Sequence, residues 1–162
     1  MKNLTEVTKY IIDNNGISFN PTRMDAKGNY LMPNKGYMVS NYGTELRMPF
    51  KSIAVKYRYL DRIDEIDALV STCISKYAYK LNEDNYFGIW VENQELVFDI
   101  SENVQDLKKA IIQGMTNKQD AIYDIVNMKT IYLPMDQSGT DYQVQSYREL
   151  AAETYLSKGK FN

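Results

Sequence analysis

Residues 86–132 carry the clearest patterning of apolar and polar side chains in this sequence, and they constrain the fold more than any other segment. Residues 86–91 and 95–100 are rich in β-branched and aromatic side chains and are separated by a short polar turn. Every second residue in each run is apolar, so one face of each strand can be buried. The pattern predicts an antiparallel hairpin with Trp90 on the opposite face.

A helix and a second hairpin follow in the same segment. Apolar residues between 104 and 115 recur at steps of three and four, which predicts a helix. Ser101 or Asn103 can cap its first turn through a side-chain oxygen. Residues 121–126 and 130–133 are two further β-rich runs around a polar turn, and they predict a second pair of strands.

The N-terminal residues predict three elements. Apolar residues at helical spacing predict a helix at 4–14, with Asn3 as its cap. A brief strand is predicted at 17–20. Residues 21–35 contain two prolines and several polar residues, and they predict a long loop.

Further along, residues 36–40 and 44–48 alternate on either side of a glycine-bearing turn, which predicts a hairpin. Residues 52–59 are ambiguous between strand and helix. A long helix is predicted from Asp61, its cap, to Leu81.

Together these elements predict an α+β fold, in which an antiparallel or mixed sheet with hairpins packs against two main helices and shorter terminal helices. One of the terminal helices is expected at 147–156. A length of 162 residues is typical of one domain, so we expect residues 1–162 to form a single domain. The composition leaves open whether residues 134–162 attach loosely as a C-terminal segment.

Segment 86–124 also carries a resemblance. A Gly-x-Trp strand precedes a Val-Phe-Asp-Ile-Ser strand, and a helix then leads to Asn-Lys-Gln-Asp-Ala-Ile-Tyr-Asp. This order is similar to that in uncharacterised small accessory proteins of bacteriophages and mobile elements. Residues 36–40 also look like an early strand of such proteins. The chain departs from the pattern at Phe98, where tyrosine is favoured, and at Lys118, which separates Asn117 from Gln119. The resemblance implies a phage or plasmid setting and assigns no catalytic residue.

Composition argues against several classes of function. The sequence has no histidine, one cysteine (Cys73), and no phosphate-binding loop or paired metal-ligand spacing. Nineteen basic and 21 acidic residues give a formal charge of −2, which disfavours both a strongly basic nucleic-acid domain and an acidic DNA mimic. No apolar run approaches the ~20 residues of a membrane span. We expect a cytoplasmic protein without membrane attachment, cofactor, metal ligand or catalytic residue.

Some side chains nevertheless bear on chemistry. Asp99 and Asp124 interrupt apolar strands; on adjacent strands they would form a pair able to hold Mg²⁺, whereas simple alternation would turn both toward solvent. Cys73 lies on the apolar face of the long helix and is expected to be buried, since a cysteine nucleophile lacks its usual histidine base here. Four acidic residues lie near the start of that helix, where the backbone dipole favours negative charge. Alternatively, they could bind a cation. They are Asp61, Asp64, Glu65 and Asp67.

Cations and tyrosines are the candidates for partner binding. Residues 51–62 combine both, as in surfaces that contact phosphates and stack on bases; the alternative is a strand with core tyrosines and solvated cations. Tyrosine and arginine are also enriched in protein interfaces. The candidate partner-binding residues are Tyr37, Tyr42, Lys51, Lys56, Tyr57, Arg58, Tyr59 and Arg62.

These observations favour a binding protein over an enzyme. The leading expectation is an inhibitor from a phage or mobile element that blocks a host protein or ribonucleoprotein complex by steric occlusion, for example a CRISPR effector (anti-CRISPR-like). Its place would be the host cytoplasm. Two alternatives stay open: a nucleic-acid-binding protein using residues 51–62, and a metal-dependent hydrolase. The chain would act as a monomer or as a homodimer paired through an exposed strand edge.

Overall fold

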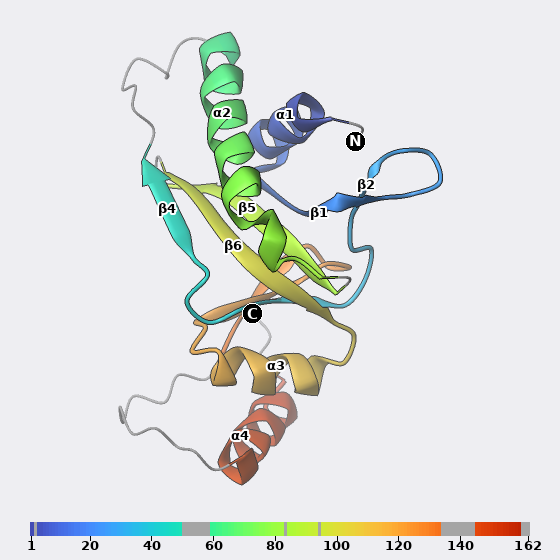
Figure 1. The fold of residues 1–162 in the computed structure, drawn as a ribbon. Coiled ribbons are helices and arrows are strands. Elements are labelled where there is room, and N and C mark those ends of the chain that lie inside the picture. Colours follow the sequence, from blue (N-terminus) through green and yellow to red (C-terminus); the bar gives the residue numbers. More distant parts are fainter. Residues whose placement is uncertain (2, 50–58, 83, 94, 134–144, 160–162) are drawn as a thin grey trace. The chain divides into compact units, whose positions relative to one another are not determined.

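The computed structural model describes residues 1, 3–49, 59–82, 84–93, 95–133 and 145–159, with the backbone alone for residues 59–62, 145–147 and 150. These residues form four α-helices and eight strands, which confirms the predicted α+β fold (Figure 1). The chain divides into two compact units. Unit 1 is Met1–Met32 with Gly43–Ser101, and unit 2 is Pro33–Tyr42 with Glu102–Asn162. The expectation of a single domain stays a prediction.

Unit 1 contains two helices and a sheet. Its strands run in the order β2-β1-β5-β6, with β4 paired to β6, and the pairs β1–β2, β1–β5 and β4–β6 are antiparallel. Its elements are α1 (Leu4–Asn14), β1 (Gly16–Met24), β2 (Tyr30–Leu31), β4 (Leu46–Pro49), α2 (Tyr59–Tyr77), a 3₁₀ turn (Ala78–Lys80), β5 (Asn85–Glu92) and the first seven residues of β6 (Glu95–Val104).

Helix α1 begins and ends as predicted. The Asn3 side chain accepts a hydrogen bond from the Glu6 amide at 2.9 Å, which satisfies one of the free N–H groups of the first turn. Asn15 follows the helix in the left-handed conformation, with φ 65°. Thr8 is fully buried on the inner face of α1, and its hydroxyl donates to Asp67 of α2 at 3.0 Å. The two helices are therefore joined by a polar bond as well as by packing.

The prediction of a loop at 21–35 is wrong for residues 21–24 and 30–31, which lie in strands, and holds for 25–29 and 32–35. Strand β1 continues through Pro21 to Met24 and pairs with β2, with a shift of register between Asn20 and Met24. A proline has no N–H to donate, so it is tolerated in a strand at such an irregularity. The Asn20 side chain bonds the neighbouring backbone there: its oxygen accepts from the Thr22 amide, and its nitrogen donates to two carbonyls near the start of β5.

Helix α2 begins earlier than predicted. Asp61 lies within a helix that already includes Tyr59, so it is not the cap. The predicted apolar face is confirmed: Ile66, Val70 and Cys73 are at most 1% exposed. Residues 50–58 lie outside the described residues, and most of the ambiguous segment 52–59 falls among them.

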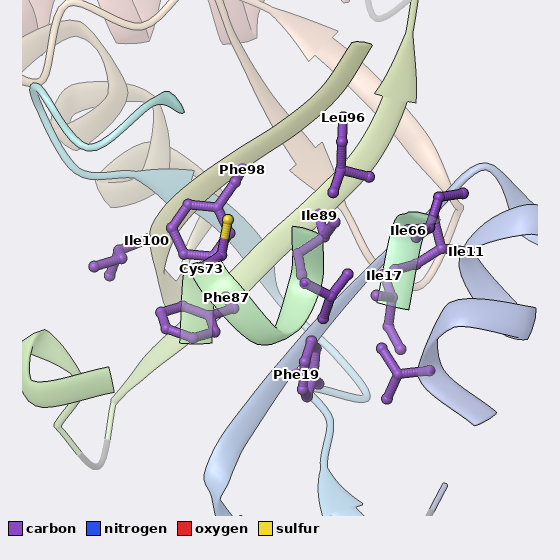
Figure 2. Packing of buried hydrophobic residues seen from close by; sticks show 12 residues of the cluster. Ile11, Ile17, Phe19, Ile66, Cys73, Phe87, Ile89, Leu96, Phe98 and Ile100 are labelled. Atoms are coloured by element: carbon purple, nitrogen blue, oxygen red, sulfur yellow. The ribbon is translucent and has the colours of Figure 1, made fainter. Parts of the chain in front are cut away.

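The core of unit 1 lies between the sheet and its helices. Phe87 of β5 and Phe98 of β6 meet edge to face, with ring centroids 4.6 Å apart, and Phe19 of β1 meets Phe87 in the same way at 6.4 Å (Figure 2). Leu96 and Ile89 extend this layer, and the side chains of the core come from strands and from both α1 and α2. The alternation in residues 86–100 thus places its apolar face as predicted.

The predicted hairpin of 36–40 with 44–48 is wrong in its pairing. Both strands exist, as β3 (Tyr37–Ser40) and β4, but they are not partners. β3 pairs with β7 (Ala121–Asp124) in unit 2, whereas β4 pairs with β6 in unit 1. Local alternation and the turn at Gly43 indicate strands here, but the partners come from distant parts of the sequence.

Unit 2 is a smaller sheet with two helices. The strand order is β3-β7-β8, and the unit also contains the last three residues of β6. The elements that follow β6 are α3 (Leu107–Thr116), β7, β8 (Lys129–Tyr132) and α4 (Gln145–Ser157). Helix α4 packs on α3, and Ala152 of α4 is fully buried among core residues of the unit.

The predicted cap of α3 is wrong. Ser101 and Asn103 belong to β6, where Ser101 bonds Asp99 and Asn103 donates to the Lys35 carbonyl at 2.9 Å. Asp106 caps the helix, because its carboxylate accepts from the Lys109 amide at 2.8 Å. Both polar residues are thus engaged within or beside the sheet, and the helix begins later than predicted.

Gly114 near the end of α3 has a packing role. A Cβ there would lie 2.5 Å from Cδ1 of Leu133 and 3.0 Å from Cγ2 of Ile122. Both of these side chains are buried in the core of unit 2. The glycine lowers helix propensity by about 1 kcal/mol relative to alanine, and it allows the helix to approach the β7–β8 hairpin closely.

Candidate functional site

The β7–β8 hairpin of unit 2 has a tight turn held by its own side chains. The Asp124 carboxylate, at the end of β7, accepts from the Asn127 amide at 3.1 Å and from its side-chain nitrogen at 2.7 Å. Met128 adopts the left-handed conformation, with φ 49°, before β8 begins. Residues 121–124 then pair with 129–132 in register. These bonds give the tip of the hairpin a defined shape.

The two faces of this hairpin have different surroundings. Ile122 and Ile131 are directly opposite each other, and both are buried in the core of unit 2. Tyr123 and Tyr132 lie on the other face, since they alternate with these isoleucines along their strands. Tyr123 is 42% exposed and Tyr132 is 67% exposed. The outer face therefore shows two aromatic rings to solvent.

Apolar side chains continue at the tip. Val126 is 66% exposed and Met128 is 79% exposed. Single exposed apolar residues are ordinary on protein surfaces, but a group on one element often marks a binding surface. We call Tyr123, Val126, Met128 and Tyr132 the hairpin surface.

Strand β8 is also tied to the last helix. The Tyr155 hydroxyl of α4 donates to the Tyr132 carbonyl at 2.5 Å. On the other side, β7 bonds β3, where Tyr37 lies opposite Asp124 and Met38 opposite Tyr123. The hairpin surface is thus supported by the sheet on one side and by α4 on the other.

A shallow groove of about 500 Å³ lies beside the hairpin tip. Burial raises the pKa of the Tyr37 hydroxyl above its ordinary value, and the charges of Asp124 and Asp106 raise it further. Asp124 is only 7% exposed, so the groove has a largely buried carboxylate in its lining. The residues that line the groove are Lys35, Gly36, Tyr37, Gln105, Asp124, Val126 and Asn127.

The predicted partner-binding residues are distributed over both units. Tyr37 lines the groove of unit 2, and Tyr42 in the same unit is 68% exposed, with the Lys118 ammonium 5.6 Å from its ring centroid. Tyr59 and Arg62 lie in the first turns of α2 in unit 1, where only the backbone is described. The remaining four lie outside the described residues: Lys51, Lys56, Tyr57 and Arg58. Nucleic-acid binding by residues 51–62 stays a prediction.

Asp99 and Asp124 do not lie on adjacent strands, because Asp99 is on β6 of unit 1 and β7 pairs with β3 and β8. They do not face solvent either: they are 3% and 7% exposed. Asp99 accepts from the Ser101 hydroxyl at 2.9 Å, and Asp124 holds the hairpin turn. The metal-dependent hydrolase stays a prediction, but its premise that Asp99 and Asp124 lie on adjacent strands is wrong.

The other candidates occupy structural positions. Cys73 is 1% exposed, as predicted, and burial raises the pKa of its thiol to about 11. In the acidic group at the start of α2, Asp64 is exposed and Asp67 accepts the Thr8 bond. Among the described residues, no three Asp, Glu or Cys side chains come together in a way that could hold a metal ion.

The sequence reasoning missed the hairpin surface, although a usable signal was present. Alternation in 121–126 and 130–133 buries Ile122 and Ile131, and the same alternation turns Tyr123 and Tyr132 outward. Outward tyrosines on both strands therefore indicate an exposed aromatic surface. The groove had no such signal, because Lys35 and Asn127 are distant in sequence.

No protein-family model, curated protein or solved structure matches this chain. In the part of the chain that the structure describes, none of the helices has the length and apolar character needed to cross a membrane. The geometry of the two units is therefore what bears on function.

Proposed function

We propose that the chain is a non-enzymatic binding protein that docks on a protein partner through its hairpin surface. The observation that carries this proposal is the exposure of four large apolar side chains on one hairpin, at 42–79% each. Removing such side chains from water on binding yields roughly 25 cal/mol per Å² of apolar surface. The fold does not use these side chains for its own core.

The chemistry of the surface is suited to a protein interface. Tyrosine provides a large, rigid ring with only two rotatable side-chain bonds, so it loses little entropy on binding. Methionine is flexible and polarisable and adapts to an irregular partner surface. Tyr123 and Tyr132 would act as anchors, and Met128 at the tip would fill a recess in the partner.

The mechanism is steric occlusion. The hairpin turn is held by Asp124 and Asn127, and β8 is bonded to Tyr155, so the surface is organised before it meets a partner. A pre-organised surface loses less conformational entropy on binding than a floppy one. Once bound, the bulk of the chain would keep substrates or other subunits away from the covered site.

The biological setting comes from the resemblance to accessory proteins of phages and mobile elements. In that setting the partner is a host protein or a ribonucleoprotein, and a defence complex such as a CRISPR effector is the most concrete form. Inhibition of such a complex requires only that its nucleic-acid channel or a subunit interface is covered. It requires no bond-making chemistry from the inhibitor.

The test is affinity capture from host lysate followed by reconstitution with the purified, identified partner. We expect Met128→Ser combined with Tyr132→Ser to weaken binding at least tenfold, since the loss of even one anchor side chain costs about 1.4 kcal/mol or more. A matched control is Met24→Ser combined with Tyr79→Ser in unit 1, where these residues are 56% and 79% exposed. Equal binding by both double variants would contradict the proposal.

A further inference from the structure

We propose that the groove beside the hairpin tip receives a cationic side chain, arginine or lysine, of the protein partner, next to the buried carboxylate of Asp124. This inference rests on the proposed function and names the chemistry of one contact. It requires that a positive group enters the groove, which Tyr37 and Val126 help to line, while the hairpin surface covers apolar parts of the partner.

The carboxylate is held ready for a ligand. Asp124 is 7% exposed, and its two oxygens accept from the backbone and side-chain nitrogens of Asn127. A carboxylate has about four lone-pair sites, so these two bonds leave capacity for another donor. Because the Asn127 bonds hold the group in place, a cation would find it already oriented.

The wall of the groove is backbone as well as side chain. Gly36 has φ +84°, and a Cβ there would lie 2.8 Å from the Val104 carbonyl oxygen and 2.8 Å from the Gln105 side-chain nitrogen. The Gly36 carbonyl accepts from the Ile125 amide at 3.1 Å, which bonds this wall to the hairpin. A glycine is therefore needed for the chain to pass this closely.

The groove offers both parts of a long cationic side chain a suitable surface. Val126 gives the aliphatic stem an apolar contact, and the Tyr37 ring and the Asp124 carboxylate can face the charged end. Two bonds from a guanidinium to a carboxylate are stronger and more directional than one from an ammonium. Arginine is therefore the preferred occupant.

Lys35 lines the same groove, and its positive charge would repel a cationic side chain. Lys35 is exposed, and water screens its charge. Asp124 is largely buried, where a charge acts with less screening, and Asp106 lies close enough to act on Tyr37 as well. Among the residues that line the groove, the buried carboxylate of Asp124 is therefore screened less by water than the exposed ammonium of Lys35, although Lys129 lies opposite Asp124 in the hairpin.

The test is a titration of the whole chain with N-acetyl-arginine methylamide, followed by amide NMR. We expect saturable shifts at Gly36 and Asn127, and much smaller ones with the neutral citrulline analogue at equal ionic strength. Asp124→Asn should weaken binding roughly tenfold, the loss expected for a hydrogen bond to a charged group. Lys35→Gln should tighten it. Asp120→Asn removes an exposed charge that does not line the groove and should change nothing.

Two results would overturn the inference: equal shifts with arginine and citrulline analogues, or preferential binding of N-acetyl-glutamate methylamide that Lys35→Gln removes. If Asp124→Asn does not fold, binding of the arginine, citrulline and glutamate analogues to the unmodified chain still tests whether the groove prefers a cation. If the groove does not select the arginine analogue but Met128→Ser with Tyr132→Ser still weakens partner binding, only the cationic contact is rejected. Loss of both effects would reject the proposed function too.

Discussion

The Asp99 carboxylate of β6 fills the space beside Gly88 of β5 in unit 1, so a Cβ on Gly88 would collide with it. Asp99 is 3% exposed and accepts from the Ser101 hydroxyl. The absence of a side chain at residue 88 thus lets a carboxylate be buried on this face of the sheet, opposite to the phenylalanine layer.

This relationship predicts a strong coupling between the two residues. Gly88→Ala should lower the free energy of unfolding by about 2–4 kcal/mol, because the collision involves a buried group that cannot move into solvent. Combining it with Asp99→Ala should cost clearly less than the sum of the single changes. Urea unfolding of the four proteins of this cycle measures the coupling. Simple additivity would show that the close approach does not matter.

The Asn20 side chain should be important for unit 1. Asn20→Ala removes the bonds to Thr22 and to the carbonyls of Asn82 and Asn85, and leaves buried polar groups without them. We expect a loss of about 2–3 kcal/mol in the free energy of unfolding. The control is Asn14→Ala, because Asn14 is exposed and its side-chain nitrogen donates to the Tyr10 carbonyl of its own helix. Similar losses in both variants would count against this assignment.

The thiol of Cys73 should make stability depend on alkaline pH. Its folded pKa of about 11 lies above the ~8.5 of an unfolded thiol, so the folded state favours the protonated form. This contribution is fully present below about pH 8.5 and is lost as pH rises through the folded pKa, by at most about 1.4 kcal/mol per pH unit. The difference in unfolding free energy between the native chain and Cys73→Ala should shrink accordingly. A difference that stays constant to about pH 10 would contradict the raised pKa.

The Asp106 cap should stabilise the first turn of α3. Asp106→Ala should destabilise unit 2 by about 1 kcal/mol, whereas Asp106→Asn should be nearly neutral, because asparagine also accepts the Lys109 amide. Amide hydrogen exchange in the first turn of α3 reads out the effect directly. The same test on Ser101→Ala should leave that turn unchanged, since Ser101 lies in β6.

The hairpin surface should be dispensable for folding. Met128→Ser should change the free energy of unfolding by less than about 0.5 kcal/mol, because Met128 is 79% exposed and lies outside the core. Ile131→Ser on the inner face of the same hairpin should be much more destabilising, since Ile131 is 5% exposed. Thermal unfolding of both variants gives the comparison. A large loss with Met128→Ser would assign that side chain to the fold.

The sequence predicts well whatever depends on near neighbours. The hairpin at residues 86–100 is correct because its alternating faces and its turn lie within one short segment. Helix α1 is correct because Asn3 and Asn15 mark its ends. The face of α2 is correct because Ile66, Val70 and Cys73 follow helical spacing.

What failed depends on distant partners. The run at 36–40 has the pattern of a strand, but the pattern does not say that Tyr37 lies opposite Asp124. Pro21 is a local signal for a loop, and the side-chain bonds of Asn20 override it. Of the candidate site, Tyr37 was predicted as a binding residue. Pairing of β3 with β7 brings Lys35 and Gly36 beside Asp124, Val126 and Asn127, and Gln105 comes from the segment after β6.

Strand β3 has a consequence for how the chain is made. Residues 33–42 belong to unit 2 but are flanked on both sides by sequence of unit 1. The ribosome synthesises these residues long before β7. During synthesis of residues 43–101, β3 therefore lacks β7 as its pairing partner. Unit 2 therefore depends on a segment encoded ahead of it, and expressing residues 102–162 alone would leave β7 without the neighbour that completes its ladder.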